Sequence, residues 1–184
     1  MKIFVISAPS GTGKNTIINR LLERRNDLIH SISTTTRAIR KGEKEAVNYY
    51  YLSKDKFNNM ISKNEFLEWA KVLDNYYGTS KKEIERIFSK NKNAILDLDV
   101  QGAFQVKKTN PESVIIFIKP PSLKELERRL KERGSESEDE IKKRLILAEV
   151  EIKTAKKFDH ILINDKLKET TEELDGIISD HVLD

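Results

Sequence analysis

The chain has 184 residues, and its 34 basic and 30 acidic side chains leave a formal net charge of +4. This length fits one domain with small appended lobes and is too short for two full-sized domains. The absence of cysteine excludes disulfides, thiolate metal sites and cysteine nucleophiles. No apolar stretch approaches the roughly 20 residues of a membrane helix, and the N-terminus has no signal-peptide pattern. We therefore expect a cytoplasmic protein with no membrane or nucleic-acid partner, because the mild basic excess suits a small polyanion in a cleft.

Strand-like and helical patterns alternate along the chain. Residues 2–7 form a continuous apolar run, and similar runs lie at 94–98, 114–118 and 160–163. Such runs are typical of strands buried on both faces of a parallel sheet. Because helical spacing separates and follows these runs, the pattern predicts a three-layer α/β fold with a parallel sheet.

Three helix starts carry the S-x-x-E spacing of a capping box. In each, a serine precedes a glutamate by three residues, so each side chain satisfies a free backbone amide of the first helical turn. The pairs are Ser80 with Glu83, Ser122 with Glu125, and Ser137 with Glu140.

Two segments interrupt the alternation of strand and helix. Residues 33–79 open with a polar, basic loop and hold all five tyrosines and the only tryptophan, which predicts an inserted lobe with some antiparallel strand. Residues 124–150 are rich in charge, with a break at Gly134-Ser135. They predict a helix pair that projects from the sheet and is buried along one narrow stripe. That stripe consists of Leu123, Leu126 and Leu130.

The segment Ala8 to Thr16 (APSGTGKNT) lies between the first predicted strand and the first predicted helix, where a phosphate-binding P-loop lies. Gly11 and Gly13 allow consecutive backbone amides to point at phosphate oxygens, and the helix that begins near Lys14 adds its positive dipole end. Lys14 supplies a point charge at the transferred phosphate. We expect this loop to bind phosphates through Ser10, Gly11, Thr12, Gly13, Lys14, Asn15 and Thr16.

The loop departs from the usual P-loop at two positions. Ala8 replaces the usual first glycine with another small residue. Asn15 stands where a serine or threonine hydroxyl normally approaches Mg²⁺. An amide oxygen also coordinates hard cations, but the side chain is longer than a hydroxyl. We expect weakened metal binding at Asn15 without loss of nucleotide binding.

The remaining motifs resemble one family. Residues 33–43 (STTTRAIRKGE) closely resemble guanylate kinase, the enzyme that phosphorylates GMP with ATP. The likeness continues, in the family's order and spacing, through residues 48–50, 65–70, 75–79, 96–102, 120–122, 127–134 and 163–165. It implies a P-loop core at residues 1–32, 81–123 and 151–184, a GMP-binding lobe at 33–80, and a mobile helical lid at 124–150.

The resemblance implies how GMP is held. Its phosphate is gripped by Arg37 and Arg40, because a planar guanidinium binds two oxygens at once, and by the hydroxyls of Tyr49 and Tyr77. Guanine presents N1–H and N2–H₂ donors beside its O6 acceptor, so a carboxylate accepts from the donors and a hydroxyl donates to O6. Adenine lacks these donors and would leave the carboxylate unpaired. The guanine-side residues that match the family are Ser33, Glu68, Gly78, Thr79 and Asp99.

Two acids have alternative interpretations from the sequence. Glu65 lies close to Glu68, so an exposed strand acid remains an alternative interpretation of Glu68. Asp97 and Asp99 alternate with leucines, which predicts that both share one face of a buried strand. Asp97 then either holds a Mg²⁺-bound water, as an acid at the end of a Walker B strand does, or bonds a helix terminus.

The resemblance places three arginines of the lid over the ATP phosphates. Arg129 and Arg133 are four residues apart and share a helix face, and Arg144 follows the Gly134 break. Asn164, just after the last predicted strand, resembles the family's loop on the adenine side. Together with Lys14 and Arg37, these arginines form the predicted catalytic set.

The sequence thus predicts a guanylate kinase that uses ATP and Mg²⁺ and acts as a monomer or homodimer. A different class is a catalytically weak or dead guanylate-kinase-like domain that binds proteins, which only Asn15 favours. A nucleotide-regulated nucleic-acid binder would fit the basic pI of about 9.1, but neither the mild net charge nor the aromatic residues support it.

Overall fold

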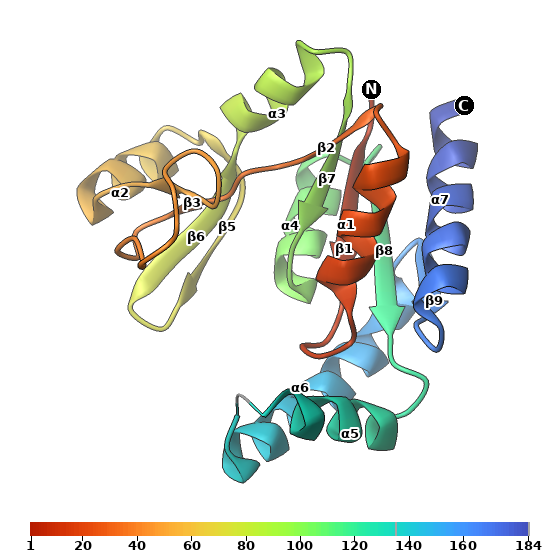
Figure 1. The fold of residues 1–184 in the computed structure, drawn as a ribbon. Helices are drawn as coiled ribbons and strands as arrows, with labels where there is room; N and C mark the ends of the chain where they lie inside the picture. The colour runs from red at the N-terminus through yellow and green to blue at the C-terminus, as the bar shows by residue number, and fades with distance from the viewer. Residues whose placement is uncertain (135, 184) are drawn as a thin grey trace.

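The computed structural model describes residues 1–134 and 136–183 and consists of a core, an inserted lobe and a projecting helix pair (Figure 1). The core sheet has the strand order β2-β7-β1-β8-β9, and each pairing is parallel. Its strands are β1 (Ile3–Ser7), β2 (Leu28–His30), β7 (Asn93–Asp97), β8 (Val114–Lys119) and β9 (His160–Ile163). The predicted three-layer α/β fold is confirmed.

Helices cover both faces of the core sheet, as Figure 1 shows. Phe4 and Ile6 of β1 face α1 (Lys14–Arg24) and α7 (Leu167–Leu183), whereas Ile3 and Val5 face α3 (Lys81–Phe88) and α4 (Val100–Thr109). All four side chains are buried, and each contributes about 1.5–3 kcal/mol to the free energy of folding. Because successive residues of a strand point to opposite faces, the continuous apolar run supplies both core layers.

The last strand, β9, differs from the prediction of a strand buried on both faces. It lies at the edge of the sheet, and Ile161 and Ile163 are 41% and 50% exposed. Leu162, which points to the opposite face, is buried. A run of three apolar residues therefore does not separate an edge strand from a central one.

The inserted lobe has its own four-stranded sheet, in the order β4-β3-β6-β5. Its elements are β3 (Thr34–Thr35), β4 (Tyr50–Tyr51), α2 (Lys54–Ser62), β5 (Phe66–Val72) and β6 (Asn75–Ser80). The predicted antiparallel pairing occurs between β5 and β6 and between β3 and β6, but β3 and β4 pair in parallel. Phe57 of α2 stacks on Phe66 with ring centroids 4.3 Å apart.

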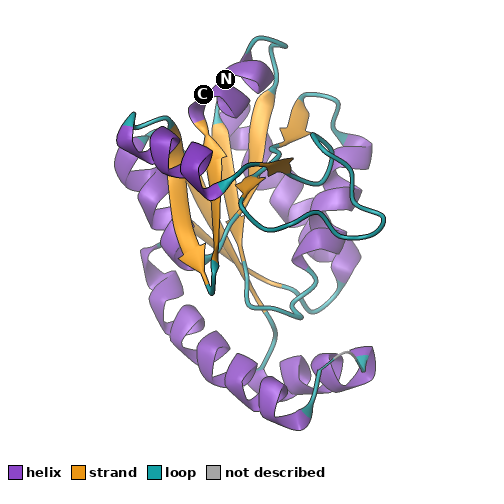
Figure 2. Ribbon diagram, turned by 90° about the vertical axis from the view of Figure 1, so that its left-hand side faces the viewer, coloured by secondary structure: helices purple, strands orange, loops and turns teal. Residues whose placement is uncertain are grey.

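The charged segment forms α5 (Leu123–Arg133) and α6 (Glu138–Thr154), which lie together below the sheet in Figure 2. Leu126, Leu130, Ile141 and Ala148 form the contact between them. The prediction for Leu123 is wrong, since this residue is 37% exposed: it begins α5, a turn before the contact. Gly134 ends α5 with φ +66°, and Ser135, the other residue of the predicted break, lies outside the described residues.

The three predicted helix starts are correct, because each serine side chain accepts a bond from the backbone N–H of the glutamate three residues on. Only Ser137 and Glu140 form the reciprocal box. The carboxylates of Glu83 and Glu125 bind arginines instead. A cap of this kind contributes about 1 kcal/mol to helix stability.

A short helical turn, η1 (Ala155–Lys157), follows α6 and leads into β9. No helix in the described part of the chain has the length and apolar character needed to cross a membrane.

Candidate active site

The P-loop joins β1 to α1 and takes the backbone conformation that its glycines allow. Gly11 and Gly13 have φ of +89° and +96°, in the left-handed region that side chains avoid. At Gly11 the space is also closed, because a Cβ there would lie 2.7 Å from Leu130 Cδ2 of α5. Helix α5 therefore packs directly on the phosphate loop.

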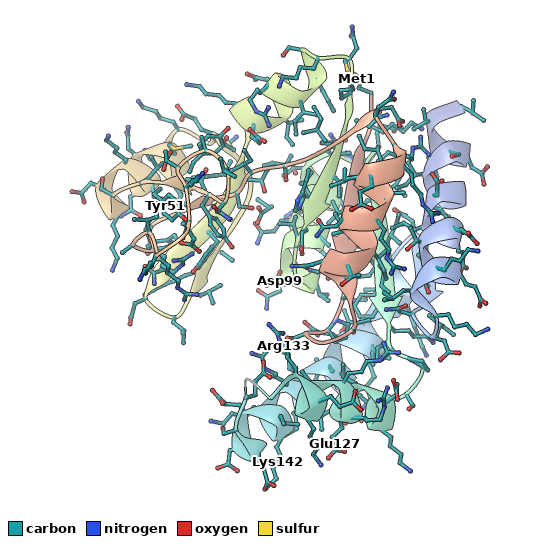
Figure 3. All side chains as sticks on the ribbon, in the orientation of Figure 1. Met1, Tyr51, Asp99, Glu127, Arg133 and Lys142 are labelled. Carbon is teal, nitrogen blue, oxygen red and sulfur yellow. The ribbon has the colours of Figure 1, made fainter. Side chains whose placement is uncertain are left out.

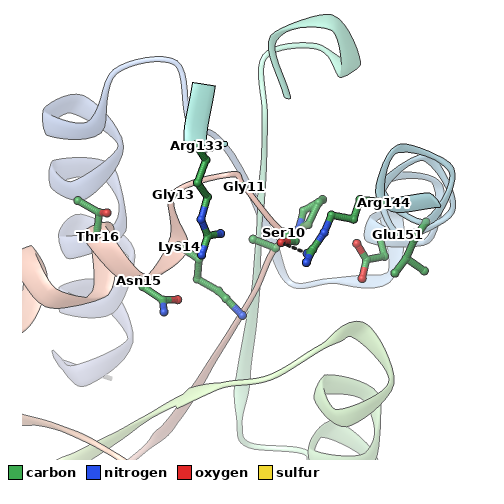
Figure 4. A pocket seen from close by; sticks show the side chains of 12 residues that line it. Ser10, Gly11, Gly13, Lys14, Asn15, Thr16, Arg133, Arg144 and Glu151 are labelled. Carbon is green, nitrogen blue, oxygen red and sulfur yellow. Dashed lines mark hydrogen bonds between the residues drawn. The ribbon is translucent and has the colours of Figure 1, made fainter. Parts of the chain in front are cut away.

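A cavity of about 630 Å³ opens on one side of this loop. Lys14, Arg133 and Arg144 extend toward it (Figure 4). Arg144 donates from Nη1 to Ser10 Oγ, and its Nη2 lies 3.4 Å from Glu136 Oε1. Three cationic side chains around a loop of backbone amides form a site for a polyphosphate.

Lys14 Nζ forms an ion pair with Asp97 Oδ1. Asp97 ends β7, the strand beside β1, so the carboxyl ends of two neighbouring parallel strands bring the pair together. Ligands of open α/β sheets bind at this edge. The ion pair therefore links Lys14, which the sequence predicts to bind phosphate, with Asp97, which it predicts as a possible metal-side acid.

The predicted lid arginines lie on different sides of the phosphate loop. Arg133 lines the cavity with Lys14, whereas Arg129 lines a neighbouring cavity of about 330 Å³ with Asp165. Arg129 Nη1 donates to the carbonyl oxygen of Asn164 at 3.1 Å. A shared helix face therefore does not give these two arginines a shared cavity.

Asn164 is buried and contacts the loop. Its Nδ2 donates to the carbonyl of Thr12 at 2.6 Å, and its Oδ1 accepts from Thr170 Oγ1 at 3.2 Å. A Cβ on Gly13 would lie 2.8 Å from Asn164 Nδ2. The amide thus braces the P-loop, and the same residue also lines the Arg129 cavity. Asn15 and Thr16 are exposed on the first turn of α1 and line the larger cavity.

A buried acid marks a second site, in the lobe. Glu68 of β5 is 6% exposed, and its Oε1 has no hydrogen-bond partner among the described residues. Thr79, its neighbour across the strands, is fully buried with Oγ1 equally unpaired. Burial raises the pKa of Glu68 to about 7; the nearby hydroxyl and N–H of Thr79 oppose the rise, and the charge of Asp99 adds to it. Unpaired buried polar atoms are costly and rare in folded proteins, so this pair points to a ligand with complementary donors and acceptors.

Asp99 faces Glu68 from the core. A Cβ on Gly102 would lie 3.3 Å from Glu68 Oε2 and 3.4 Å from Asp99 Oδ1, so both carboxylates converge there. The prediction that Asp97 and Asp99 share a strand face is wrong. Strand β7 ends at Asp97, and Asp99 caps α4 by accepting from the N–H of Gly102 at 2.7 Å. Figure 3 shows Asp99 at the edge of the core toward the lobe.

Gly78 has a packing role beside Glu68. A Cβ at this position would lie 2.7 Å from the carbonyl oxygen of Glu68, so the two lobe strands approach closely only with glycine here. Ser33 is half-buried, and its carbonyl oxygen accepts from the N–H of Tyr50 at 2.9 Å.

The predicted phosphate-binding residues of the lobe form a cluster around Arg37. Its guanidinium lies 5.4 Å from the ring centroid of Tyr49, and the Tyr49 and Tyr77 rings are 6.0 Å apart. Arg37 Nη2 is bonded to Glu43 Oε1 at 2.7 Å. That bond is the main reason why the pKa of Glu43 falls to about 2. Arg40 is exposed, and its backbone N–H also donates to Glu43.

Sequence reasoning missed two acids of these sites. Glu43 forms an ion pair with Arg37, the residue predicted to bind a phosphate, and Glu151 of α6 lines the P-loop cavity. Burial raises the pKa of Glu151, the nearby Asp99 adds to the rise, and Lys14 opposes it. Glu151 follows Arg144 by seven residues, two helical turns, so helical periodicity from Arg144 would have found it.

A cation-lined cavity at the first strand-to-helix turn, together with two acids that converge between an inserted lobe and the core, is the arrangement of a P-loop protein with two nucleotide sites. This is the class of the nucleoside monophosphate kinases. Comparison with known proteins narrows that class to one family.

The sequence profile of guanylate kinase matches residues 1–181. The curated guanylate kinases of Clostridioides difficile and Prochlorococcus marinus subsp. pastoris are 46% and 45% identical to this chain over 177 residues, covering 96% of it and 86% and 96% of their own lengths. The crystal structure of guanylate kinase from Anaplasma phagocytophilum matches with a TM-score of 0.75 at 36% identity, covering 97% of this chain and 85% of that one. The chain therefore belongs to the guanylate kinase family, as its motifs predict.

Two of the three histidines lie outside the cavities described above. The structure brings these two together, with Nε2 of His160 and Nε2 of His181 2.9 Å apart. Among the described residues, no cluster of three or more histidine or acidic side chains has the geometry of a metal site.

Proposed function

We propose that this chain transfers the γ-phosphoryl group of ATP to GMP and releases ADP and GDP. The observation that carries the proposal is Glu68, a buried acid with an unpaired oxygen, whose carboxylate converges with that of Asp99. Guanine has two adjacent N–H donors for such an acid. The base of AMP, CMP or UMP does not offer the same pair of donors.

The P-loop end binds ATP. Backbone amides of residues 10–16 surround its phosphates, and Lys14, Arg133 and Arg144 neutralise their charge. Arg129, Asn164 and Asp165 line the adjoining cavity, where the adenosine end lies. The lid helices α5 and α6 carry all three arginines and close over the bound nucleotide, excluding water from the transfer.

The metal that accompanies ATP is Mg²⁺. Asn15 provides an amide oxygen at the cavity, and Asp97 provides a carboxylate beside Lys14, which also lines it. Mg²⁺ in such sites takes one or two protein oxygens together with phosphates and waters. The residues present thus fit the ion, with Asp97 acting through a bound water. When bound, Mg²⁺ supplies charge neutralisation between the ATP phosphates. Asp97 is paired with Lys14 in this structure, so Lys14 exchanges that partner for the phosphate.

The lobe end binds GMP. Arg37, Arg40, Tyr49 and Tyr77 hold its phosphate, and that phosphate displaces Glu43 from Arg37. Glu68 and Asp99 accept from the guanine N–H groups. Thr79 and Ser33 donate hydroxyls, with Gly78 leaving space between the strands.

In the transfer itself, a GMP phosphate oxygen attacks the γ-phosphorus, and the bond between that phosphorus and the β,γ-bridging oxygen breaks. The lysine and arginines stabilise the charge that spreads over the transferred group, and the remaining effect comes from alignment of the two nucleotides. The active species is a monomer or homodimer, and the compartment is the cytoplasm, where both substrates are available.

The substrate assignment predicts strong selectivity among nucleoside monophosphates. We expect kcat/KM with GMP to exceed that with AMP by about 10²-fold or more, since one bidentate base contact contributes roughly 1–3 kcal/mol and two acids face the pocket. A coupled assay of ADP formation with GMP, AMP, CMP and UMP measures this. Equal turnover of AMP would contradict the guanine assignment, and absence of ADP at millimolar Mg²⁺ and ATP would favour the protein-binding alternative.

Replacement of Asn15 tests the metal site. We expect Asn15→Ser to lower the Mg²⁺ concentration at half-maximal rate by about 2- to 10-fold, because a hydroxyl at this position fits the cation more closely than an amide. The measurement is a Mg²⁺ titration of initial rate at saturating nucleotides. Asn19→Ser, the same substitution at an exposed position one turn further along α1, serves as the control and should leave the Mg²⁺ dependence unchanged. An unchanged Mg²⁺ dependence would show that residue 15 is not a metal contact.

A further inference from the structure

The carboxylate of Glu83 lies where the chain passes from the lobe to the core. Glu83 is in the first turn of α3, which follows lobe strand β6 directly and buries Ile84 and Ile87 in the core. Figure 1 shows α3 between the lobe and the core sheet. A bond from Glu83 back to the lobe therefore connects the two parts at their junction.

Four hydrogen bonds from three segments converge on this carboxylate. The N–H of Ile32, on the chain that enters the lobe, donates to Oε1 at 2.9 Å, and the hydroxyl of Tyr50 in β4 donates to Oε2 at 3.0 Å. Arg86, in the same helix, donates Nε to Oε2 at 2.8 Å and Nη2 to Oε1 at 2.7 Å. The Glu83 side chain has 0% exposed surface. Burial raises the pKa of Glu83, but the bonds from Arg86, Ile32 and Tyr50 outweigh it, so the pKa lies below its ordinary value.

Helix stability alone does not explain this arrangement. A glutamate three residues after Ser80 would complete a capping box by bonding back to the serine N–H, as Glu140 does with Ser137. Glu83 instead directs its carboxylate to Ile32 and Tyr50. A buried ion pair is also weak evidence for stability, because desolvation offsets much of the attraction.

The lobe has a second support at α4. The N–H of Trp69 donates to Gln105 Oε1 at 3.2 Å. Thr109 Oγ1 lies 3.3 Å from the carbonyl oxygen of Leu67, with a shorter contact of 3.0 Å to the carbonyl oxygen of Gln105 in its own helix. Glu68 lies between Leu67 and Trp69 on β5 and faces Asp99. The guanine pocket is thus held at α4, while Glu83 holds the strands at the other edge of the lobe sheet, where β4 lies.

We propose that Glu83 is a positioning residue for GMP binding, which holds the lobe at the angle where Glu68 faces Asp99. The inference rests on the proposed function. When the bond to Tyr50 is absent, the lobe is held mainly at α4 and visits orientations in which the pocket is incomplete. Apparent affinity for GMP then falls in proportion to the fraction of time spent in the competent orientation.

Tyr50→Phe tests the proposal, because it removes one donor and keeps the ring. Glu83 Oε2 retains its bond from Arg86, so no buried acceptor is left unpaired. We expect KM for GMP to rise roughly 3- to 10-fold, the range for one hydrogen bond, with kcat and KM for ATP changed less than about twofold. Glu83→Gln, which weakens the bonds to Arg86 as well, raises KM for GMP at least as much.

The control is Asp175→Asn. It weakens a core ion pair in which Arg25 Nη1 lies 2.9 Å from Asp175 Oδ1, away from the lobe. This variant lowers the thermal midpoint without changing KM for GMP. If Glu83 only stabilised the fold, Tyr50→Phe would likewise lower the thermal midpoint and leave KM for GMP unchanged.

Lobe orientation is read directly by a distance measurement that needs no activity. The chain has no cysteine, so Asn58→Cys in α2 and Glu172→Cys in α7, both exposed, accept one spin label each. We expect Tyr50→Phe to broaden the distance distribution in the nucleotide-free protein. An unchanged distribution, or a KM for GMP that is unchanged or lower, would overturn the proposal. Failure of the labelled parent to phosphorylate GMP would instead count against the proposed function.

Discussion

Lys14→Met should lower kcat by about 10³-fold while leaving KM for GMP within about threefold. The substitution keeps the aliphatic stem and removes the lysine charge that lines the P-loop cavity. Groups that stabilise developing charge in a closed site contribute about 10²- to 10³-fold each. The lysine charge acts on the transferred phosphate, which binds at the loop, whereas GMP binds in the lobe. Loss of turnover with retained GMP binding is therefore the expected signature.

The measurement pairs the coupled assay with calorimetric titration of GMP and of ATP. The Lys14–Asp97 pair is mostly buried, with 18% and 23% of the two side chains exposed, so its loss leaves Asp97 without its partner and lowers stability. The thermal midpoint of the variant is therefore measured beside kcat, and the assay is run well below that midpoint. Lys90→Met, an exposed lysine that follows α3, serves as the matched control. A kcat within a few-fold of the parent would show that the charge acts elsewhere.

The phosphate loop could be predicted from the sequence because its geometry is local. Two glycines with positive φ and a helix that begins at Lys14 follow from residues 8–16 alone. The lobe and the projecting helices were also predictable in outline, because a cluster of aromatic residues and a highly charged segment interrupt the otherwise regular alternation of strands and helices.

The end of β7 could not be predicted in the same way. Residues 96–99 alternate leucine and aspartate, and that pattern is the same whether the strand continues or stops. Pairing with β1 ends at Asp97 opposite Ile6, and the cap of α4 then takes Asp99 off the strand. The residue at which β7 ends therefore depends on its pairing with β1, a strand that is distant in sequence.

The separation of Arg129 from Arg133 has a similar cause. Their spacing of four residues correctly gives one helix face. That face packs over Gly11 through Leu126 and Leu130, so the two arginines fall on opposite sides of the loop. The contacts of Glu83 with Ile32 and Tyr50 likewise span 51 and 33 residues of sequence, beyond any local pattern.

Glu68→Gln should raise KM for GMP by about 10- to 100-fold, since a carboxamide presents an N–H₂ group where guanine presents donors. One good bidentate contact to a base contributes roughly 1–3 kcal/mol, which corresponds to this range. Turnover with AMP should change much less, because adenine lacks both the N1 proton and the 2-amino group. Glu65→Gln, three residues earlier and without the burial of Glu68, is the matched control and should leave KM for GMP unchanged.

The pH dependence of GMP binding follows from the same side chain. Burial raises the pKa of Glu68 to about 7, so a rise from about pH 6 to pH 8 converts the free acid into the carboxylate that guanine needs. KM for GMP should fall over that interval in the parent. The GMP phosphate titrates in the same range, but it does so equally in Glu68→Gln, so the ratio of the two KM values isolates the acid.

As pH rises, folding stability should fall, whereas GMP binding should strengthen. The pKa of Glu68 rises from 4.5 to about 7 on folding, so the folded chain binds more protons between those values, and folding stability falls as pH rises through them. At about pH 8 the buried carboxylate costs about 3 kcal/mol in the free energy of unfolding. Glu68→Gln should therefore be more stable than the parent to urea at pH 8 but not at about pH 5. Equal stability at both pH values, with KM for GMP unchanged, would mean that Glu68 is an ordinary strand acid and that the pocket reads guanine through Asp99 alone.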